Sequence, residues 1–157
     1  MRLRIAMLSA YLLSLGVLYV AALTVPPLPL SERVKRADHI FLGTCEKMVV
    51  TDETGQAVVP EPKVLDHGQA IDMLVRVQEV FRPVGWTTNM PVTVRFGGGF
   101  FSVKDIREQF SNRQFIYIVS KRNSHFTPSY QWSFPEPLEK RADIEKALSS
   151  ADEKTEH

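Results

Sequence analysis

The clearest pattern in the chain is an alternation of apolar and polar residues from Ile71 to Arg82. Every second side chain in its first part is apolar, and these are Ile71, Met73, Val75 and Val77. A period of two predicts a β-strand with one buried face. The alternation slips at Gln78 and Glu79, and this slip predicts a β-bulge that bends the strand as a small barrel requires.

Similar patterns predict four more strands and three helices around this one. The strands are expected at 38–50, 92–96, 114–120 and 126–134. A short helix is expected at 32–37 after an N-cap at Ser31, a second one begins at a capping box at 102–105, and a last one covers 138–149. Gly43 inside the first strand predicts a bend or close packing.

A helix between strands three and four of five is typical of an OB-type barrel. We therefore predict a mainly β fold, a five-stranded OB-like closed barrel with that short helix and a C-terminal helix, preceded by an N-terminal hydrophobic helix. A chain of 157 residues with 44% hydrophobic content suits one domain with its own core. The expected division is a leader with a proline-rich linker at 1–30, a barrel domain at 31–150 and a polar tail at 151–157.

The leader predicts export. Arg2 and Arg4 precede a run from Ile5 to Val25 that carries no charge. Such a run indicates a secretory signal or a retained signal anchor. An uncleaved leader would hold residues 5–25 in the inner membrane with the domain on the periplasmic or extracytoplasmic side, whereas cleavage near Ala22 would release a soluble periplasmic or secreted protein.

Charge and cysteine content restrict the function further. The formal net charge is +1, yet the segment 82–122 contains seven Arg and Lys residues against Asp105 and Glu108. This segment is either a solvated barrel wall or a surface for an anionic partner. Cys45 is the only cysteine, so an intrachain disulfide is impossible and a buried structural thiol is expected.

No pattern of residues predicts catalysis, a metal site or a cofactor. His39 and Cys45 are six residues apart on one predicted strand, a separation of about 20 Å, so they cannot form a nucleophile and base pair. The four histidines are too far apart in sequence for a local metal signature. Asp66, His67 and Asp72 are close in sequence, but loop capping by Asp66 explains them more simply than acid–base chemistry.

Four segments together resemble the netrin-like module of tissue inhibitors of metalloproteases and of exported bacterial proteins. They are residues 32–44, 75–81, 92–95 and 115–119. The resemblance implies a closed five-stranded barrel that binds or inhibits and is not an enzyme. The animal inhibitors chelate the protease zinc through a cysteine at the mature N-terminus, and here the only cysteine is Cys45, so inhibition of that kind does not carry over.

We therefore expect a non-catalytic exported binding module that recognises a protein or an envelope component. The candidate binding residues are Trp86, Phe100, Phe101 and Trp132. One alternative is a secreted or periplasmic enzyme or protease inhibitor whose site forms no motif. A second is a barrel that binds single-stranded nucleic acid on Tyr117, Tyr130 and Trp132, which the export signal argues against.

Overall fold

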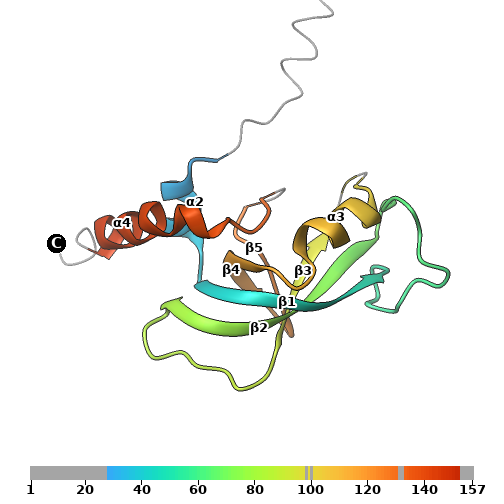
Figure 1. Cartoon of the computed structure of the whole chain (residues 1–157), viewed down its shortest axis with the longest axis horizontal. Helices are drawn as coiled ribbons and strands as arrows, with labels where there is room; N and C mark the ends of the chain where they lie inside the picture. The colour runs from blue at the N-terminus through green and yellow to red at the C-terminus, as the bar shows by residue number, and fades with distance from the viewer. Residues whose placement is uncertain (1–27, 98, 100, 131–132, 153–157) are drawn as a thin grey trace, which may run out of the picture.

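The computed structural model describes residues 28–97, 99, 101–130 and 133–152 (Figure 1). The elements in chain order are α2 (Leu30–Arg36), β1 (His39–Thr51), β2 (Ala70–Arg82), β3 (Val92–Gly97), α3 (Val103–Phe110), β4 (Gln114–Arg122), β5 (His125–Pro128), the 3-10 turn η1 (Leu138–Lys140) and α4 (Arg141–Asp152). The predicted leader at 1–27 lies outside the described residues. Within the part that is described, no helix is both long and apolar enough to cross a membrane.

The strands pair in a closed ring in the order β1-β2-β3-β5-β4, and β4 pairs with β1 again. All pairs are antiparallel except β3 with β5, which is a parallel contact at Val94 and Phe126 alone. The mainly β fold, the helix between strands three and four, and the C-terminal helix are therefore confirmed. The paired stretch is shortest between β3 and β5.

The predicted bulge in β2 is present. Leu42 of β1 pairs with Glu79, while Gly43 pairs with Val77, so Gln78 is the extra residue. A second shift leaves Phe81 without a paired residue in the same way. Because each extra residue reverses the side on which the next side chain lies, Val80 packs against the interior and Phe81 against the outer wall.

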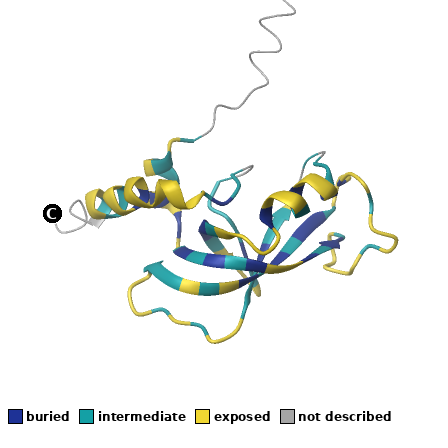
Figure 2. Cartoon of the chain, viewed as in Figure 1, coloured by how far each residue is buried: buried dark blue, intermediate teal, exposed yellow. Residues whose placement is uncertain are grey.

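Two apolar clusters hold the fold together, one inside the ring and one outside it. The inner cluster contains Met73 and Val75 of β2 together with Tyr117 and Val119 of β4. The outer cluster lies under α2 and α4, and its buried residues are Val34, Ala37, Ile40, Ile116, Ile118 and Ile144. Figure 2 shows α4 exposed over much of its length, and Ile144 is the residue of α4 that is buried in the outer cluster. Strand β4 is apolar on both faces because it separates the two clusters.

Helix α3 begins as the capping box predicts. The Ser102 hydroxyl accepts a hydrogen bond from the Asp105 backbone N–H at 3.3 Å, which satisfies one of the free donors at the helix start. The three apolar residues Val103, Ile106 and Phe110 are all buried. Helix α3 therefore covers one end of the ring with its apolar face.

Two predicted boundaries are wrong. Ser31 lies inside α2, because Pro29 takes the cap position and its carbonyl accepts hydrogen bonds from the N–H groups of Glu32 and Arg33. The fifth strand ends at Pro128 and does not continue to Phe134. Proline has no N–H for the ladder. The Ser133 N–H donates to the Tyr130 carbonyl, and the chain returns to β4 at Glu136.

Candidate binding site

A pocket of about 420 Å³ lies beside α3, between the end of β3 and the segment that follows β5. We call it the Phe134 pocket. Its apolar walls come from Leu65 in the β1–β2 connection, Phe96 of β3, Phe101, Ile106 of α3 and Phe134. Its polar lining comes from Arg95, Arg122, Thr127, Ser129 and Ser133. A volume of a few hundred Å³ with apolar walls and few polar groups is typical of a ligand site.

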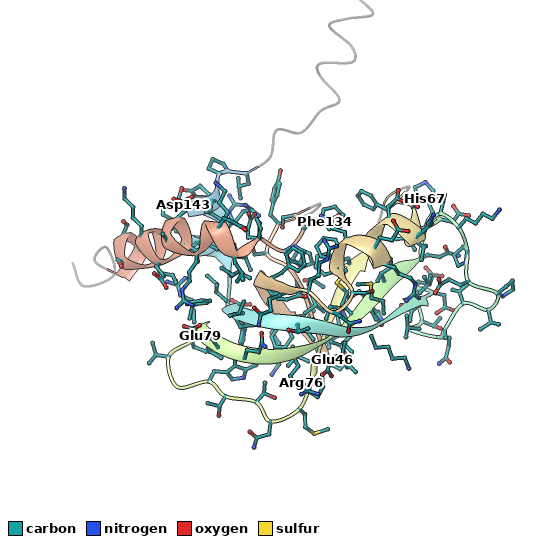
Figure 3. The ribbon with its side chains drawn as sticks, in the orientation of Figure 1. Glu46, His67, Arg76, Glu79, Phe134 and Asp143 are labelled. Carbon is teal, nitrogen blue, oxygen red and sulfur yellow. The ribbon has the colours of Figure 1, made fainter. Side chains whose placement is uncertain are left out.

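Phe134 stands at the centre of an aromatic group and is labelled in Figure 3. Its ring stacks on Phe96 with centroids 6.0 Å apart and on Phe110 at 5.6 Å, and it meets the edge of Phe101 at 5.2 Å. These are preferred aromatic geometries. The segment after β5 thus inserts a side chain between β3 and α3.

Arg95 on the outer face of β3 is held by an ion pair with its cross-strand neighbour. Its Nε and NH2 groups each donate to a different carboxylate oxygen of Asp72 at 2.7 Å. This hydrogen bonding raises the pKa of the Arg95 guanidinium. Asp72 balances the charge of Arg95 and holds its side chain in place. Arg95 therefore adds polar surface to the pocket but no net charge.

Arg122 differs from Arg95 in having no balancing group. It is exposed at the end of β4, where its backbone pairs with His125, and neither a hydrogen bond nor an ion pair joins its side chain to any other described residue. An uncompensated guanidinium beside an apolar cavity attracts an anionic group. The Phe134 pocket therefore combines an aromatic interior with one positive charge at its edge.

The candidate binding residues do not lie together. Phe101 lines the pocket. Trp86 is half-buried and packs against the inner cluster. Its ring centroid lies 4.9 Å from that of His39, the first residue of β1, and 5.9 Å from that of Phe126. Phe100 and Trp132 lie outside the described residues.

His39, at the same end of the strand ring as Trp86, is packed between aromatic side chains. The His39 ring meets the edges of both Trp86 and Phe126 at 4.9 Å, and its Nδ1 atom is buried without a hydrogen-bond partner in the described structure. Burial lowers the pKa of His39, although Asp38 acts in the opposite direction. A neutral imidazole packed in this way serves the core.

The side chains that could act as a nucleophile or as an acid or base, Cys45, Asp66 and Asp72, have structural roles. Cys45 is buried, and burial raises the pKa of its thiol to about 11, so the nucleophilic thiolate is scarce at neutral pH. Asp66 accepts a hydrogen bond from the His67 N–H at 2.7 Å, as the loop-capping interpretation predicts, and Asp72 binds Arg95. Among the described residues, no three His, Cys, Asp or Glu side chains are grouped to hold a metal ion.

The basic segment at 82–122 is less available than its sequence indicates. Arg107 binds Glu61 and Arg95 binds Asp72, both acidic residues from outside the segment. Tyr117, one of the aromatic residues considered for stacking bases, is completely buried. The local excess of positive charge is therefore reduced in the folded protein, and of the two basic residues that line the Phe134 pocket, Arg95 is paired with Asp72 while the Arg122 side chain has no acidic partner among the described residues.

Sequence reasoning missed Phe134 and Arg122 as site residues. The sequence places Phe134 at the end of the expected strand 126–134, whereas β5 ends at Pro128 and Phe134 lies outside the sheet. The proline itself, together with Pro135 and Pro137, was the available signal that the strand stops early. Arg122 was counted only as one charge in a basic segment.

The fold and the pocket place the chain among mainly β proteins with a closed five-stranded sheet. Comparison with models of known protein families finds no match, and comparison with curated proteins finds no significant similarity.

Proposed function

We propose that this protein is an exported, non-catalytic binding module built on an OB-type barrel, and that the Phe134 pocket holds an extended segment of a protein partner. The strand order β1-β2-β3-β5-β4, with α3 between β3 and β4, supports the OB-type assignment and agrees with the resemblance to netrin-like modules. In OB-type barrels the binding surface includes strands two and three and the loop between strands one and two. Leu65, Arg95 and Phe96 come from those parts of this chain.

The observation that carries this proposal is the uncompensated charge of Arg122 at the edge of an aromatic pocket of about 420 Å³. The rings of Phe96, Phe101 and Phe134 favour an aromatic or large aliphatic side chain. Arg122 favours a carboxylate next to it. The partner segment is therefore one in which an apolar anchor and an acidic residue are neighbours.

A peptide display library panned against the full chain tests this preference directly. We expect enrichment of peptides with an aromatic residue beside Asp or Glu, because both parts of the pocket are then satisfied. Arg122→Glu should remove the acidic preference, since it reverses the charge at the edge while leaving the aromatic walls unchanged. Arg113→Glu is the matched control, because Arg113 is also exposed but does not line the pocket.

Other results would contradict the proposal. Enrichment that is identical for the wild type and Arg122→Glu would remove the pocket as the recognition site. Turnover of an envelope substrate by the purified protein, abolished by Asp66→Ala or His67→Ala, would make it an enzyme. Binding of single strands with steep salt dependence would indicate a nucleic-acid-binding barrel.

The proposed location follows from the leader. The charge-free run from Ile5 to Val25 supports export, with the domain tethered to the membrane if the leader is retained. N-terminal sequencing of the native protein from fractionated cells decides between the two forms. A sequence that starts near residue 23 in a soluble extracytoplasmic fraction means cleavage, an intact start in the membrane fraction means an anchor, and recovery from the cytosol contradicts export.

A further inference from the structure

A groove of about 450 Å³ lies between α2 and α4 and shares no lining residue with the Phe134 pocket. The two helices lie side by side at one end of the molecule (Figure 1), packed on the outer cluster. Three lysines line the groove, Lys35 of α2, Lys140 of η1 and Lys146 of α4, against one acidic lining residue, Asp143. We call it the lysine groove. Segments from both ends of the described chain thus bring positive charge to one place.

The present contacts of these lysines hold them only weakly. The Lys35 ammonium binds Glu32 at 2.8 Å and the Lys140 ammonium binds Asp143 at 3.3 Å, and in both pairs the two side chains are exposed. Exposed ion pairs of this kind contribute little to stability. The Lys146 side chain is exposed as well, and within the described part of the chain it makes neither a hydrogen bond nor an ion pair. Anionic groups can therefore bind these lysines without breaking a contact on which the fold depends.

The lysine groove is also the part of the domain that the leader reaches first. Leu30 lines the groove and is the first residue of α2, and the charge-free run of the leader ends at Val25. The five residues from Pro26 to Leu30 span at most about 18 Å even when fully extended. A leader that stays in a membrane therefore keeps this edge of the groove near the lipid headgroups, whose charges act over about 8 Å at physiological ionic strength.

Apolar surface in the groove supports a lipid more than a free anion. Leu30 and Ala147 are partly exposed and line the groove together with the lysines. Helical surfaces that lie on membranes combine basic side chains with apolar ones, because the basic groups bind headgroup phosphates and the apolar groups meet the start of the acyl chains. The composition of the groove and its place beside the leader therefore favour the same ligand.

We propose that the lysine groove docks the barrel domain on the anionic phospholipid surface of the membrane that holds the leader. The inference rests on the proposed export and on a retained leader, and it is independent of the Phe134 pocket. Headgroup phosphates take the places of Glu32 and Asp143 as partners of Lys35 and Lys140, and they give Lys146 a partner. Because the leader makes docking an intramolecular step, weak individual contacts are sufficient.

Acetylation of lysines in the full chain, reconstituted into vesicles, tests the proposal. A membrane-impermeant acetylating reagent is applied to vesicles of phosphatidylcholine alone and of equal parts phosphatidylcholine and phosphatidylglycerol, and mass spectrometry gives the rate at each lysine. Rates are taken relative to Lys104 of α3, which is exposed, has an acidic partner in Glu108 and lies outside the groove. We expect the groove lysines to react about fivefold or more slowly in the anionic vesicles, the gain of one lysine near such a surface. About 1 M NaCl should abolish the difference, because the Debye length is then about 3 Å.

Charge reversal in the groove separates docking from mere nearness to the membrane. In Lys35→Glu combined with Lys146→Glu, Lys140 should react at the same relative rate in both kinds of vesicle. Lys47→Glu combined with Lys63→Glu is the matched control, since it makes the same change of charge at exposed residues outside the groove and should leave Lys140 protected. If the reversed variant does not fold, Lys35→Gln with Lys146→Gln removes the same charges without adding repulsion and should also lose the protection.

Three results would overturn the inference while the chain still floats with the vesicles. Equal rates at the groove lysines in both kinds of vesicle would mean that anionic lipid does not bind them, whether they react fast or are covered by another segment such as 153–157. Protection that persists after charge reversal would assign it to proximity alone. Equal protection by inorganic phosphate in phosphatidylcholine vesicles would make the groove a site for a free anion.

Failure of the proposed tether gives a different result. A full chain that floats with neither kind of vesicle would contradict the retained leader, and the docking inference would fall with it. The binding role of the Phe134 pocket is tested separately, because the peptide selection depends on Arg122 and not on the groove lysines.

Discussion

At the scale of single residues, Gly43 shows why one position in β1 must lack a side chain. A Cβ atom at Gly43 would lie 2.5 Å from Cγ1 of Val75 and 2.8 Å from the carbonyl oxygen of Arg76. Both distances are shorter than real Cβ contacts, and one partner is backbone that cannot rotate away. The close approach of β1 and β2 at the bulge therefore depends on glycine, as its place in the strand predicted.

We expect Gly43→Ala to lower the free energy of unfolding by about 1–3 kcal/mol, the usual cost of forcing an extra carbon into a packed site. Chemical denaturation measures it. Gly97→Ala is the control, because a Cβ there would lie 3.7 Å from Cβ of Ala70, an ordinary contact. Equal stabilities of the two variants would show that the strands separate at little cost.

His39 gives the protein a pH-dependent stability. Burial lowers its pKa in the folded protein below the value of about 6.5 that it has when unfolded. The unfolded state therefore binds more protons below that pH, so the contribution of His39 is present above about pH 6.5 and is lost as the pH falls toward the folded pKa.

Unfolding experiments between about pH 8 and about pH 5.5 test this. We expect the stability of the wild type to fall over this range and the fall to be smaller in His39→Phe, which keeps the contacts with Trp86 and Phe126. A remaining slope is expected from His125, because burial and the charge of Arg95 lower its pKa as well. An unchanged slope in His39→Phe would exclude His39 as its source.

At the scale of elements, α3 is the helix that local sequence specifies best. Its cap residue Ser102 and the spacing of its buried residues Val103, Ile106 and Phe110 follow from nearby sequence. The last strand is different, since its end depends on how Pro128 meets β4 and on where Glu136 returns. Local sequence patterns predict an element well only when contacts with segments distant in the chain do not determine where the element ends.

We expect Ser102→Ala to lower the free energy of unfolding by about 1 kcal/mol, because the first turn of α3 loses its side-chain acceptor. Thermal or chemical unfolding of the purified protein measures the change. Ser149→Ala in α4 is the control, since its hydroxyl only returns to the Glu145 carbonyl of its own helix. A cost for Ser149→Ala as large as that for Ser102→Ala would refute the capping argument.

At the scale of the whole molecule, the outer cluster joins the first and last helices to the barrel wall. Val34 of α2 and Ile144 of α4 are both fully buried against Ile116 of β4 and its neighbours. Arg141 adds a surface clamp, since its guanidinium binds both carboxylate oxygens of Glu79 in β2 and lies over the Phe81 ring. The two helices therefore depend on each other although they lie at opposite ends of the described chain.

We expect Ile144→Ala to cost about 2–4 kcal/mol of stability, the range for removing a fully buried aliphatic side chain. Hydrogen exchange should then become faster in α2 as well as α4, while α3 keeps its protection because it packs on the inner cluster. Leu148→Ala, at a half-buried position of the same helix, should cost less. Faster exchange confined to α4 would contradict the coupling of the two helices.

The sequence by itself determined which residues of β2 face the interior, where β2 bulges, and where α3 begins. These features depend on periodicity and on capping, which act over a few residues. Only the tertiary structure decided that Phe134 leaves the sheet, that Asp72 balances Arg95 while Arg122 remains uncompensated, and that Trp86 packs against the core. Those outcomes depend on contacts between residues far apart in the chain, and the geometry of ring closure, which no local pattern contains, brings those residues together.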